Sequence, residues 1–503
     1  MELLVSAKRT VGSLLDTPRK RIACVGIVMA LVWGAMMACQ AIHEPAFSPD
    51  WSLMSEVGRR MALGDTLYVD TMDQKGPLCY ATYALMWLVL HTPTNVYVAS
   101  NVLVWVSLAA SSLICARMVE DARKPWAHFI AQGLLSGVLI VPHVGCLELW
   151  FMPFGLLTAL WVRRIALGKS VPDLCWVIVG LAAAYTLWCK FTCVAQFVFL
   201  LCYGAAQRNR RGLLRAGIIA IATCILASAV VLLWVWLIGS FDGMVRHHIH
   251  AASDGYATRM SMLSHLKSDN PSTTHVSSFF CGLAVALWSI LVSTRSAAPR
   301  RRVLVVLGGA LLMACCFATF VGYYRFQLAA LAVVGACDLK GTFVHKDKPM
   351  PRLSLAWKLL LSAIGIVAVA LNTWYTCSGS INTFYSAERM RTTLHETIGD
   401  DKSVIVWTFD HTWAYAELGL DYPYAIPARY NASQDLWRET AQEAVGEHRW
   451  HYIVVTVGND VKVGHKVEVG GQWYPVVGVE SSMAIAETPY DGDQLTNEPY
   501  RLP

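Results

Sequence analysis

Charged residues are scarce in this 503-residue chain. Asp, Glu, Lys and Arg make up 15% of the sequence and hydrophobic residues make up 55%, whereas globular proteins average about 25% charged residues. The mean hydropathy is +0.44. One water-soluble core cannot enclose so much apolar surface. The composition therefore excludes a soluble multidomain protein and predicts that lipid surrounds much of the chain.

Three further features are missing from the sequence. The fifteen cysteines are an odd number and only Cys377 lies in the last 130 residues, which excludes a disulfide framework. The formal net charge of +6 is modest, so it indicates an orientation bias of membrane loops and no nucleic-acid partner. Neither an internal repeat nor a low-complexity tract is present.

Eleven apolar runs are candidate transmembrane helices, although several are shorter than the roughly 17–20 residues that a straight span needs. They are Ile22–Ile42, Val96–Cys115, Phe129–Val141, Leu149–Val162, Leu174–Trp188, Phe191–Ala206, Leu213–Ser240, Phe279–Thr294, Val303–Val321, Phe326–Leu339 and Leu355–Trp374. A further run, Leu78–Leu90, has only 13 residues. Length alone does not decide which of these runs cross the membrane.

Positive charge decides the topology. Six clusters of Lys and Arg lie at the N-terminus or between two runs, around Arg19, Arg123, Arg164, Arg211, Arg301 and Lys346. All six face the cytoplasm together only if Leu78–Leu90 does not cross. We therefore predict that Leu78–Leu90 is an interfacial or re-entrant helix. The N-terminus is then cytoplasmic, and everything after Trp374 is extracytoplasmic.

The predicted fold class is an all-α polytopic cell-membrane protein of about eleven transmembrane helices, followed by a small extracytoplasmic α/β domain. Residues 1–374 form the transmembrane domain, with a first outside loop at 43–95, and residues 375–503 form the α/β domain. Polar residues return in the second part, and Val-rich and Ile-rich runs predict buried strands. The predicted strands are Ser403–Phe409, Tyr452–Val457 and Tyr474–Val479, and the predicted helices are Ser386–Ile398 and Gln434–Glu447.

The first outside loop begins with an amphipathic pattern. Trp51, Met54, Val57 and Met61 follow helical spacing, which predicts a helix over Trp51–Leu63 lying on the membrane surface. Asp50 precedes this helix at the predicted N-cap, a position at which Asp is common for purely structural reasons. Capping alone therefore explains an Asp at this position, and a second role needs other support.

The residues after this helix resemble a known family. Tyr68-Val69-Asp70 and then Asp73-Gln74-Lys75-Gly76-Pro77-Leu78, following one span and an Asp-led helix, are similar to integral-membrane glycosyltransferases of the C-type fold. These include the protein O-mannosyltransferases, the aminoarabinose transferases and the bacterial wall-polysaccharide transferases, which use polyprenyl-phosphate sugars. The resemblance extends more loosely over the spans, the loop at Tyr323–Phe326 and the C-terminal domain.

The resemblance implies specific roles for two acidic residues. Asp50 corresponds to the catalytic base, and Glu148 matches an acidic residue that relatives carry in the second outside loop. Many relatives have Asp-Glu at the first position, where this chain has Asp50-Trp51. The Asp-x-Asp motif of the metal-dependent relatives is missing, so no cofactor is expected and a divalent metal, although chemically possible, is unsupported.

The proposed chemistry also fits the residues independently. A carboxylate at the membrane–water boundary can accept the proton of an attacking hydroxyl, and a lipid-phosphate leaving group needs positive charge nearby. Lys75 is the first candidate for that charge and Arg325 the second, whereas Arg246 and Lys190 are weaker. Snorkelling of a long side chain to the interface explains any of these cations equally well.

Two neighbours complete the predicted substrate-binding residues, namely Tyr324 and His247. The histidines at 247, 248 and 250 invite a zinc hypothesis, but no Cys or carboxylate has suitable spacing. Lys190, between Cys189 and Phe191, is expected at an outer helix turn in contact with water.

The predicted function is transfer of a hexose or pentose from a polyprenyl-phosphate donor to an extracytoplasmic acceptor, with inversion and an Asp base. The expected partners are this donor, a cell-wall glycan, lipoglycan or protein acceptor, and membrane lipid. Two alternatives stay open. A transporter or lipid flippase favours ionisable residues at mid-membrane and paired repeats. A polysaccharide polymerase or ligase is typically built around a large late loop.

Overall fold

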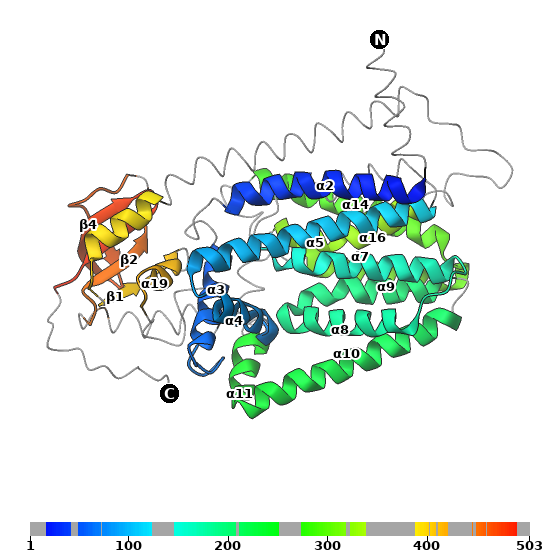
Figure 1. Ribbon diagram of the computed structural model, residues 1–503, viewed down its shortest axis with the longest axis horizontal. Helices are drawn as coiled ribbons and strands as arrows, with labels where there is room; N and C mark the ends of the chain where they lie inside the picture. Colours follow the sequence, from blue (N-terminus) through cyan, green and yellow to red (C-terminus); the bar gives the residue numbers. More distant parts are fainter. Residues whose placement is uncertain are drawn as a thin grey trace, which may run out of the picture.

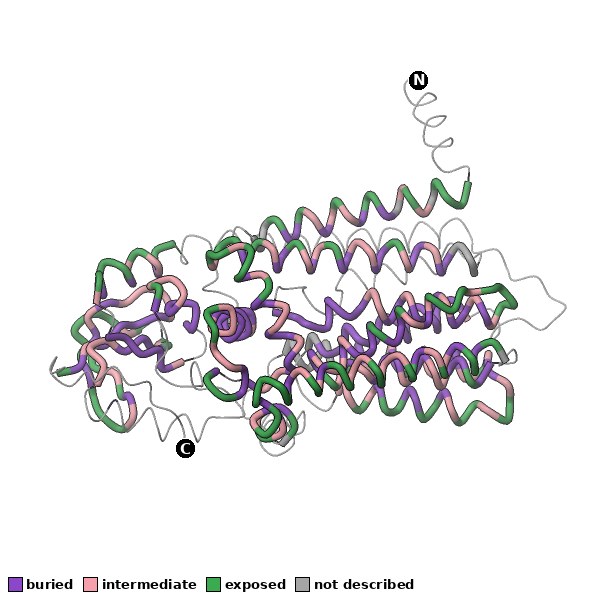
Figure 2. The backbone as a smooth tube through the Cα atoms, turned by 60° about the horizontal axis from the view of Figure 1, so that its bottom comes forward, coloured by how far each residue is buried: buried purple, intermediate pink, exposed green. Residues whose placement is uncertain are grey.

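The structure is a computed structural model in which a bundle of helices carries a small sheet at one end (Figure 1). It describes residues 17–41, 49–71, 73–122, 145–207, 211–250, 273–317, 322–338, 388–401, 403–408, 411–420, 445, 449–458 and 460–489. Buried residues gather in the middle of the bundle, while outer helices alternate between exposed and intermediate positions (Figure 2).

The bundle consists of apolar helices, because a segment in hydrocarbon must satisfy its backbone hydrogen bonds internally. The longer helices are α2 (Pro18–Ala41), α5 (Pro93–Ala122), α7 (Leu147–Ala166), α8 (Asp173–Cys189), α9 (Ala195–Ala206), α10 (Arg211–Leu237), α14 (Thr273–Ser296), α15 (Arg302–Phe317) and α16 (Leu328–Asp338). Helix α16 is buried from Leu328 to Cys337 and is central, whereas α10 exposes large apolar side chains such as Leu226 and Leu237.

Short helical segments join these helices. They are η2 (Phe191–Val194), α11 (Phe241–Met244), η3 (Val245–His250), η5 (Pro299–Arg301) and η6 (Gly322–Gln327). Within the described ranges, three helices are long and apolar enough to cross a membrane, namely those within Pro18–Ala38, Pro93–Val119 and Gly212–Leu237. The predicted count of eleven spans is not confirmed. Each predicted run in the described part coincides with helix, whereas Phe129–Val141 and Leu355–Trp374 lie outside the described residues.

Helices α3 (Pro49–Ala62) and α4 (Pro77–Leu90) lie within the predicted first outside loop. Helix α4 has 14 residues, so it is about 21 Å long and too short to cross a hydrocarbon core of about 30 Å. Helix α3 begins at Pro49, which places Asp50 in its first turn. Asp50 therefore lies two residues after the N-cap position at which it is predicted.

The expectation that α3 lies on the membrane surface stays a prediction, but the helix is more enclosed by protein than that expectation implies. All of its residues from Trp51 to Arg59 are buried, including the polar Ser52, Ser55 and Glu56. The apolar face packs against α4, and the polar face is covered by the C-terminal domain, with which α3 shares contacts through α19 (Trp413–Glu417). The helix is thus enclosed between the bundle and the sheet domain (Figure 1).

The C-terminal domain contains one five-stranded sheet in the order β1-β2-β5-β4-β3. The strands are β1 (Val404–Val406), β2 (Tyr452–Thr456), β3 (Lys466–Val469), β4 (Gln472–Glu480) and β5 (Met483–Glu487). Strands β1 and β2 pair in parallel, with Ile405 opposite Ile453, and the other pairs are antiparallel. The three predicted strands coincide with β1, β2 and β4.

A second core closes one face of this sheet. Met390, Leu394 and Ile398 of the helix at 388–398 pack with β1 and α19. This helix lies within the predicted Ser386–Ile398. The predicted helix Gln434–Glu447 lies outside the described residues, apart from Val445. Parallel pairing and a packed helix make the domain α/β, as the composition of this part predicts.

The sheet domain lies at the same end of the bundle as α3 and α11 (Figure 1). We therefore expect reporter fusions after Thr92 and after position 375 to report the same, extracytoplasmic side. A fusion after Ala166, whose helix carries Arg163 and Arg164 in its last turn, is the matched control and should report the cytoplasm. A cytoplasmic signal from either of the first two fusions would contradict the topology.

Candidate active site

The loop that carries Lys75 is fastened to a break between two helices. The Gly76 amide donates to the Cys189 carbonyl at 3.0 Å, at the point where α8 ends and η2 begins. A Cβ atom on Gly76 would lie 2.0 Å from the Trp188 carbonyl oxygen, so only glycine fits here. Pro77 then opens α4 at its first position, which suits a residue without an N–H group.

Two tyrosines fix the backbone of Lys75. Tyr68 donates to the Lys75 carbonyl at 2.5 Å, and the Tyr80 hydroxyl accepts from the Lys75 amide at 2.9 Å. Tyr80 in turn donates to Asp73 Oδ2 at 2.7 Å. Asp73 is therefore a buried acceptor that orders the loop. The Lys75 side chain is half-buried and does not take part in these bonds.

Lys190, at the helix break, is buried and paired, contrary to the expectation of a water-exposed turn. Its Nζ lies 2.5 Å from Glu148 Oε1 and 3.8 Å from the centroid of the Tyr324 ring. Lys190 is 8% exposed and Glu148 is 1% exposed. Glu148 occupies the first turn of α7, where the positive end of the helix dipole favours a carboxylate.

Arg325 follows Tyr324 in η6 and is also buried. Its guanidinium carbon lies 5.6 Å from the centroid of the Phe317 ring, a cation–π distance. The structure thus brings the predicted residues Glu148, Tyr324 and Arg325 into one region together with Lys190, because Tyr324 both covers Lys190 and adjoins Arg325.

Several buried polar atoms around these residues have no hydrogen-bond partner among the described residues. They are Glu148 Oε2, Trp188 Nε1, Thr192 Oγ1 and both amide atoms of Gln327. Trp188 and Thr192 each lie two residues from Lys190, and Gln327 lies two residues from Arg325. Buried polar atoms are almost always satisfied in folded proteins, so these atoms mark positions at which water or a polar ligand would bind.

His248 joins the Lys75 loop from the other side. Its Nδ1 lies 2.9 Å from the Gln74 carbonyl oxygen, and its ring meets Phe191 edge-on at 5.9 Å. Burial lowers the pKa of His248, and the positive charge of Lys75 lowers it further, while the bond to Gln74 acts in the opposite direction. A neutral ring then carries its hydrogen on Nδ1, because a carbonyl can only accept.

The neighbouring predicted residues are less enclosed. Arg246 is exposed and His247 is half-buried. His248 was missed by sequence reasoning, because the three histidines of the string are indistinguishable without the helical geometry of η3. Among the described residues, no three His, Cys, Asp or Glu side chains come together as a metal site.

Asp50, in the first turn of α3, is linked to this region through side chains of α4. Asp50 is half-buried, and its carboxylate is among the groups that raise the pKa of the Tyr83 phenol, after burial itself, Cys79 and Tyr185. The Tyr83 ring lies 5.5 Å from the ring of Trp150, which is two residues beyond Glu148 on α7. Two aromatic rings therefore connect the Asp50 end of α3 with the Glu148 end of α7.

An apolar groove of about 630 Å³ ends beside Arg325. It is lined by α14 and α15 side chains, namely Leu283, Leu287, Ile290, Val306, Ala310, Met313, Ala314 and Phe317. Phe317 is also the ring beneath Arg325. A Cβ atom on Gly282 would lie 3.0 Å from Arg325 Cδ and 3.4 Å from the Phe317 ring, so α14 packs closely against Arg325 at this end of the groove.

Comparison with known proteins identifies the fold. No protein-family model and no curated protein matches the sequence. The crystal structures of ArnT from Cupriavidus metallidurans, bound to undecaprenyl phosphate and in the apo state, both match with a TM-score of 0.56 and 11% identity. Each match covers 92% of this chain and 97% of ArnT. These matches confirm the predicted resemblance to the C-type glycosyltransferase fold, whereas the predicted number of spans is not confirmed.

The Glu148–Lys190 pair yields a stability prediction. Glu148→Gln leaves a buried ammonium without its counter-charge and should destabilise the protein by about 3–5 kcal/mol. Lys190→Met should have a similar effect, whereas the double variant should lose much less than the sum. Thermal unfolding in detergent measures all three.

The exposed pair Arg215–Asp173, at the start of α8, is the matched control. Asp173→Asn should change the unfolding temperature little, because exposed pairs contribute about 0–1 kcal/mol. Additive losses in the double variant would show that Glu148 and Lys190 are not coupled.

Proposed function

We propose that this protein transfers a sugar from a polyprenyl-phosphate donor to a hydroxyl group of an extracytoplasmic glycan, lipoglycan or protein. The observation that carries the proposal is the junction at Arg325, where an apolar groove meets a buried cationic region in a C-type glycosyltransferase fold. A lipid phosphate has the same two parts, an apolar chain and an anionic head.

The donor fits this junction from both sides. The groove offers only apolar side chains to a prenyl chain. Lys75, Lys190 and Arg325 offer positive charge, while Glu148 neutralises one of them in the absence of donor. The match to ArnT bound to undecaprenyl phosphate supports this class of donor.

Asp50 is the proposed base. The acceptor oxygen attacks the anomeric carbon and forms the new C–O bond while the bond from this carbon to the phosphate oxygen breaks. The hydroxyl proton passes to the Asp50 carboxylate, and the electron pair leaves with the polyprenyl phosphate. Attack opposite to the leaving group inverts the anomeric centre. The cations stabilise the leaving phosphate.

The buried ion pairs do not favour the transporter alternative. Helix α7 carries two buried ion pairs, Glu148 with Lys190 and Arg163 with Asp338. Fifteen residues of helix separate them by about 22 Å, so the pairs lie near opposite ends of α7. Transporters instead place such groups near the midplane of the bilayer.

Asp50→Asn tests the base. Asn cannot accept the proton, and general-base catalysis contributes about 10²–10⁴-fold. We expect turnover to fall by this factor at saturating donor, while the loss of a first-turn charge costs only about 0.3–1 kcal/mol of stability. Release of polyprenyl monophosphate is the measurement, and release of a diphosphate would instead indicate a ligase.

The control is Asp65→Asn, because Asp65 lies just after the same helix and pairs with Arg60. Glu56 and Asp73 are unsuitable controls, since both are buried and bonded. A fully active Asp50→Asn protein would falsify the base assignment.

Substitutions of Lys75 test whether it binds the donor phosphate. Both tyrosines bond its backbone, so Lys75→Ala should leave these backbone bonds intact while it removes the charge. A hydrogen bond to a charged group contributes about 1.5–3 kcal/mol, so donor KM should rise roughly 10- to 100-fold. Lys75→Arg should retain most of the affinity, because the charge acts as a point charge. Lys169→Ala, at the opposite end of α7, should not affect KM.

A further inference from the structure

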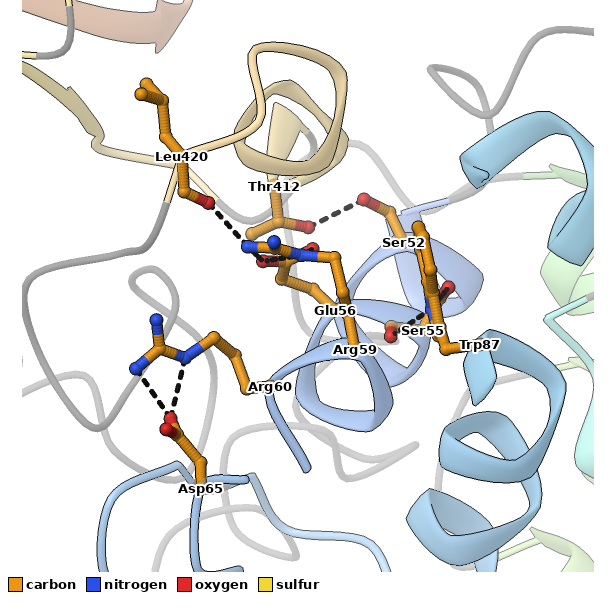
Figure 3. A network of polar contacts seen from close by, with 9 residues as sticks. All are labelled: Ser52, Ser55, Glu56, Arg59, Arg60, Asp65, Trp87, Thr412 and Leu420. Carbon is orange, nitrogen blue, oxygen red and sulfur yellow. Dashed lines mark hydrogen bonds and ion pairs between the residues drawn. The ribbon is translucent and has the colours of Figure 1, made fainter. Parts of the chain in front are cut away.

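Two polar contacts join α3 to the C-terminal domain on the face opposite α4 (Figure 3). The Ser52 and Thr412 hydroxyl oxygens lie 2.7 Å apart. Arg59 Nη2 donates to the Leu420 carbonyl at 2.5 Å. The first contact is two residues from Asp50 and the second is near the other end of the helix. Together they set both the distance and the angle between α3 and the domain.

The second contact is built around a buried ion pair. Arg59 Nε donates to both Glu56 carboxylate oxygens at 3.0 Å, and Nη2 donates to Oε1 at 2.7 Å. Glu56 is 2% exposed and Arg59 is 9% exposed. Glu56 therefore holds the guanidinium in one orientation, in which Nη2 also reaches Leu420. A charge pair on a helix surface alone would be solvated and mobile.

The acceptor of this contact belongs to the core of the domain. Leu420 packs in the same cluster as Met390, Val404 and Val406. Its amide donates to the Tyr415 carbonyl at 2.8 Å, and the Tyr415 hydroxyl accepts from the Val406 amide of β1 at 2.9 Å. The contact from Arg59 thus reaches the sheet through Leu420 and Tyr415 and does not end in a loop.

The opposite face of α3 is held by α4. A Cβ atom on Gly58 would lie 2.4 Å from Tyr83 Cβ, so the two helices are in close contact. Trp87 Nε1 also donates to the Ser55 carbonyl at 2.9 Å. Helix α3 is therefore clamped from two sides, and a shift of the C-terminal domain must move α3 or break the Arg59 contact. Nine residues of rigid helix, about 13.5 Å, separate Arg59 from Asp50.

We propose that Arg59, oriented by Glu56, is a positioning residue through which the C-terminal domain sets the orientation of Asp50. This inference rests on the proposed function, because Asp50 is its endpoint. The domain then contributes to turnover without supplying a group to the reaction. The donor, held by the cations and the groove, is bound independently of this contact.

The test compares Arg59→Ala with Arg59→Lys and with Arg60→Ala. Arg60 is the adjacent residue, and its partner Asp65 lies in the loop after the same helix. A misplacement of about 1 Å at a reacting group costs about 10²-fold in rate. We expect Arg59→Ala to lower kcat 10- to 100-fold with donor KM unchanged, Arg59→Lys to recover part of the loss, and Arg60→Ala to behave as wild type.

Hydrogen exchange of residues 49–62 and 411–420 reports the same contact without relying on activity. Both segments should exchange faster in Arg59→Ala and not in Arg60→Ala. Wild-type kcat in folded Arg59→Ala, or an equal loss in Arg60→Ala, would overturn the proposal. If Arg59→Ala does not fold, Ser52→Ala and Thr412→Val serve as substitutes, because neither leaves a buried charge unpaired. Both should lower kcat at unchanged donor KM. Wild-type kcat in both variants would overturn the proposal.

The double variant Asp50→Asn/Arg59→Ala separates this inference from the proposed function. If Arg59 acts through Asp50, the double variant is no slower than Asp50→Asn alone, and a further 10-fold loss would refute the positioning role. An active Asp50→Asn protein refutes the base itself. In that case the exchange data still decide whether Arg59 couples the domain to α3.

Discussion

The Glu148–Lys190 pair is the contact around which the bundle is organised. An ammonium and a carboxylate in a low-dielectric interior are stable only together, so each fixes the segment that carries the other. Lys190 interrupts the helix between α8 and η2, and the carbonyl exposed by that interruption receives the Gly76 amide. Tyr324 covers the same ammonium. The first loop, α7 and η6 therefore meet at one point.

That meeting point has opposite surroundings on its two sides. One side is the apolar groove between α14 and α15, which suits a lipid chain. The other side is the Lys75 loop with His248 of η3, which is polar. The proposed transfer from a lipid-linked donor to an extracytoplasmic acceptor needs this boundary, because the prenyl chain of the donor stays in an apolar environment while its sugar meets the acceptor.

Much of the fold and part of the site are predictable from local sequence. Hydropathy locates helices because the bilayer imposes internal backbone bonding, and Val-rich runs locate β1 and β2. The positions of Lys75 and Glu148 follow from the family resemblance. The pairing of Glu148 with Lys190 does not, because the two are distant in sequence and only tertiary packing shows that Lys190 is buried. His248 was missed for the same reason, since its partner Gln74 lies in another loop.

The enclosure of α3 is the most informative of these differences. Its spacing of apolar residues is that of an interfacial helix, and Glu56 and Arg59 have the composition of a solvated face. A membrane-surface helix needs one buried face, whereas α3 has two, because the C-terminal domain supplies acceptors at Thr412 and Leu420 that match its polar side chains. A helix enclosed in this way cannot rotate without breaking charged hydrogen bonds. The residue at its first turn, Asp50, is therefore held more firmly than interfacial lipid alone could hold it, and that rigidity suits the role of general base proposed for it.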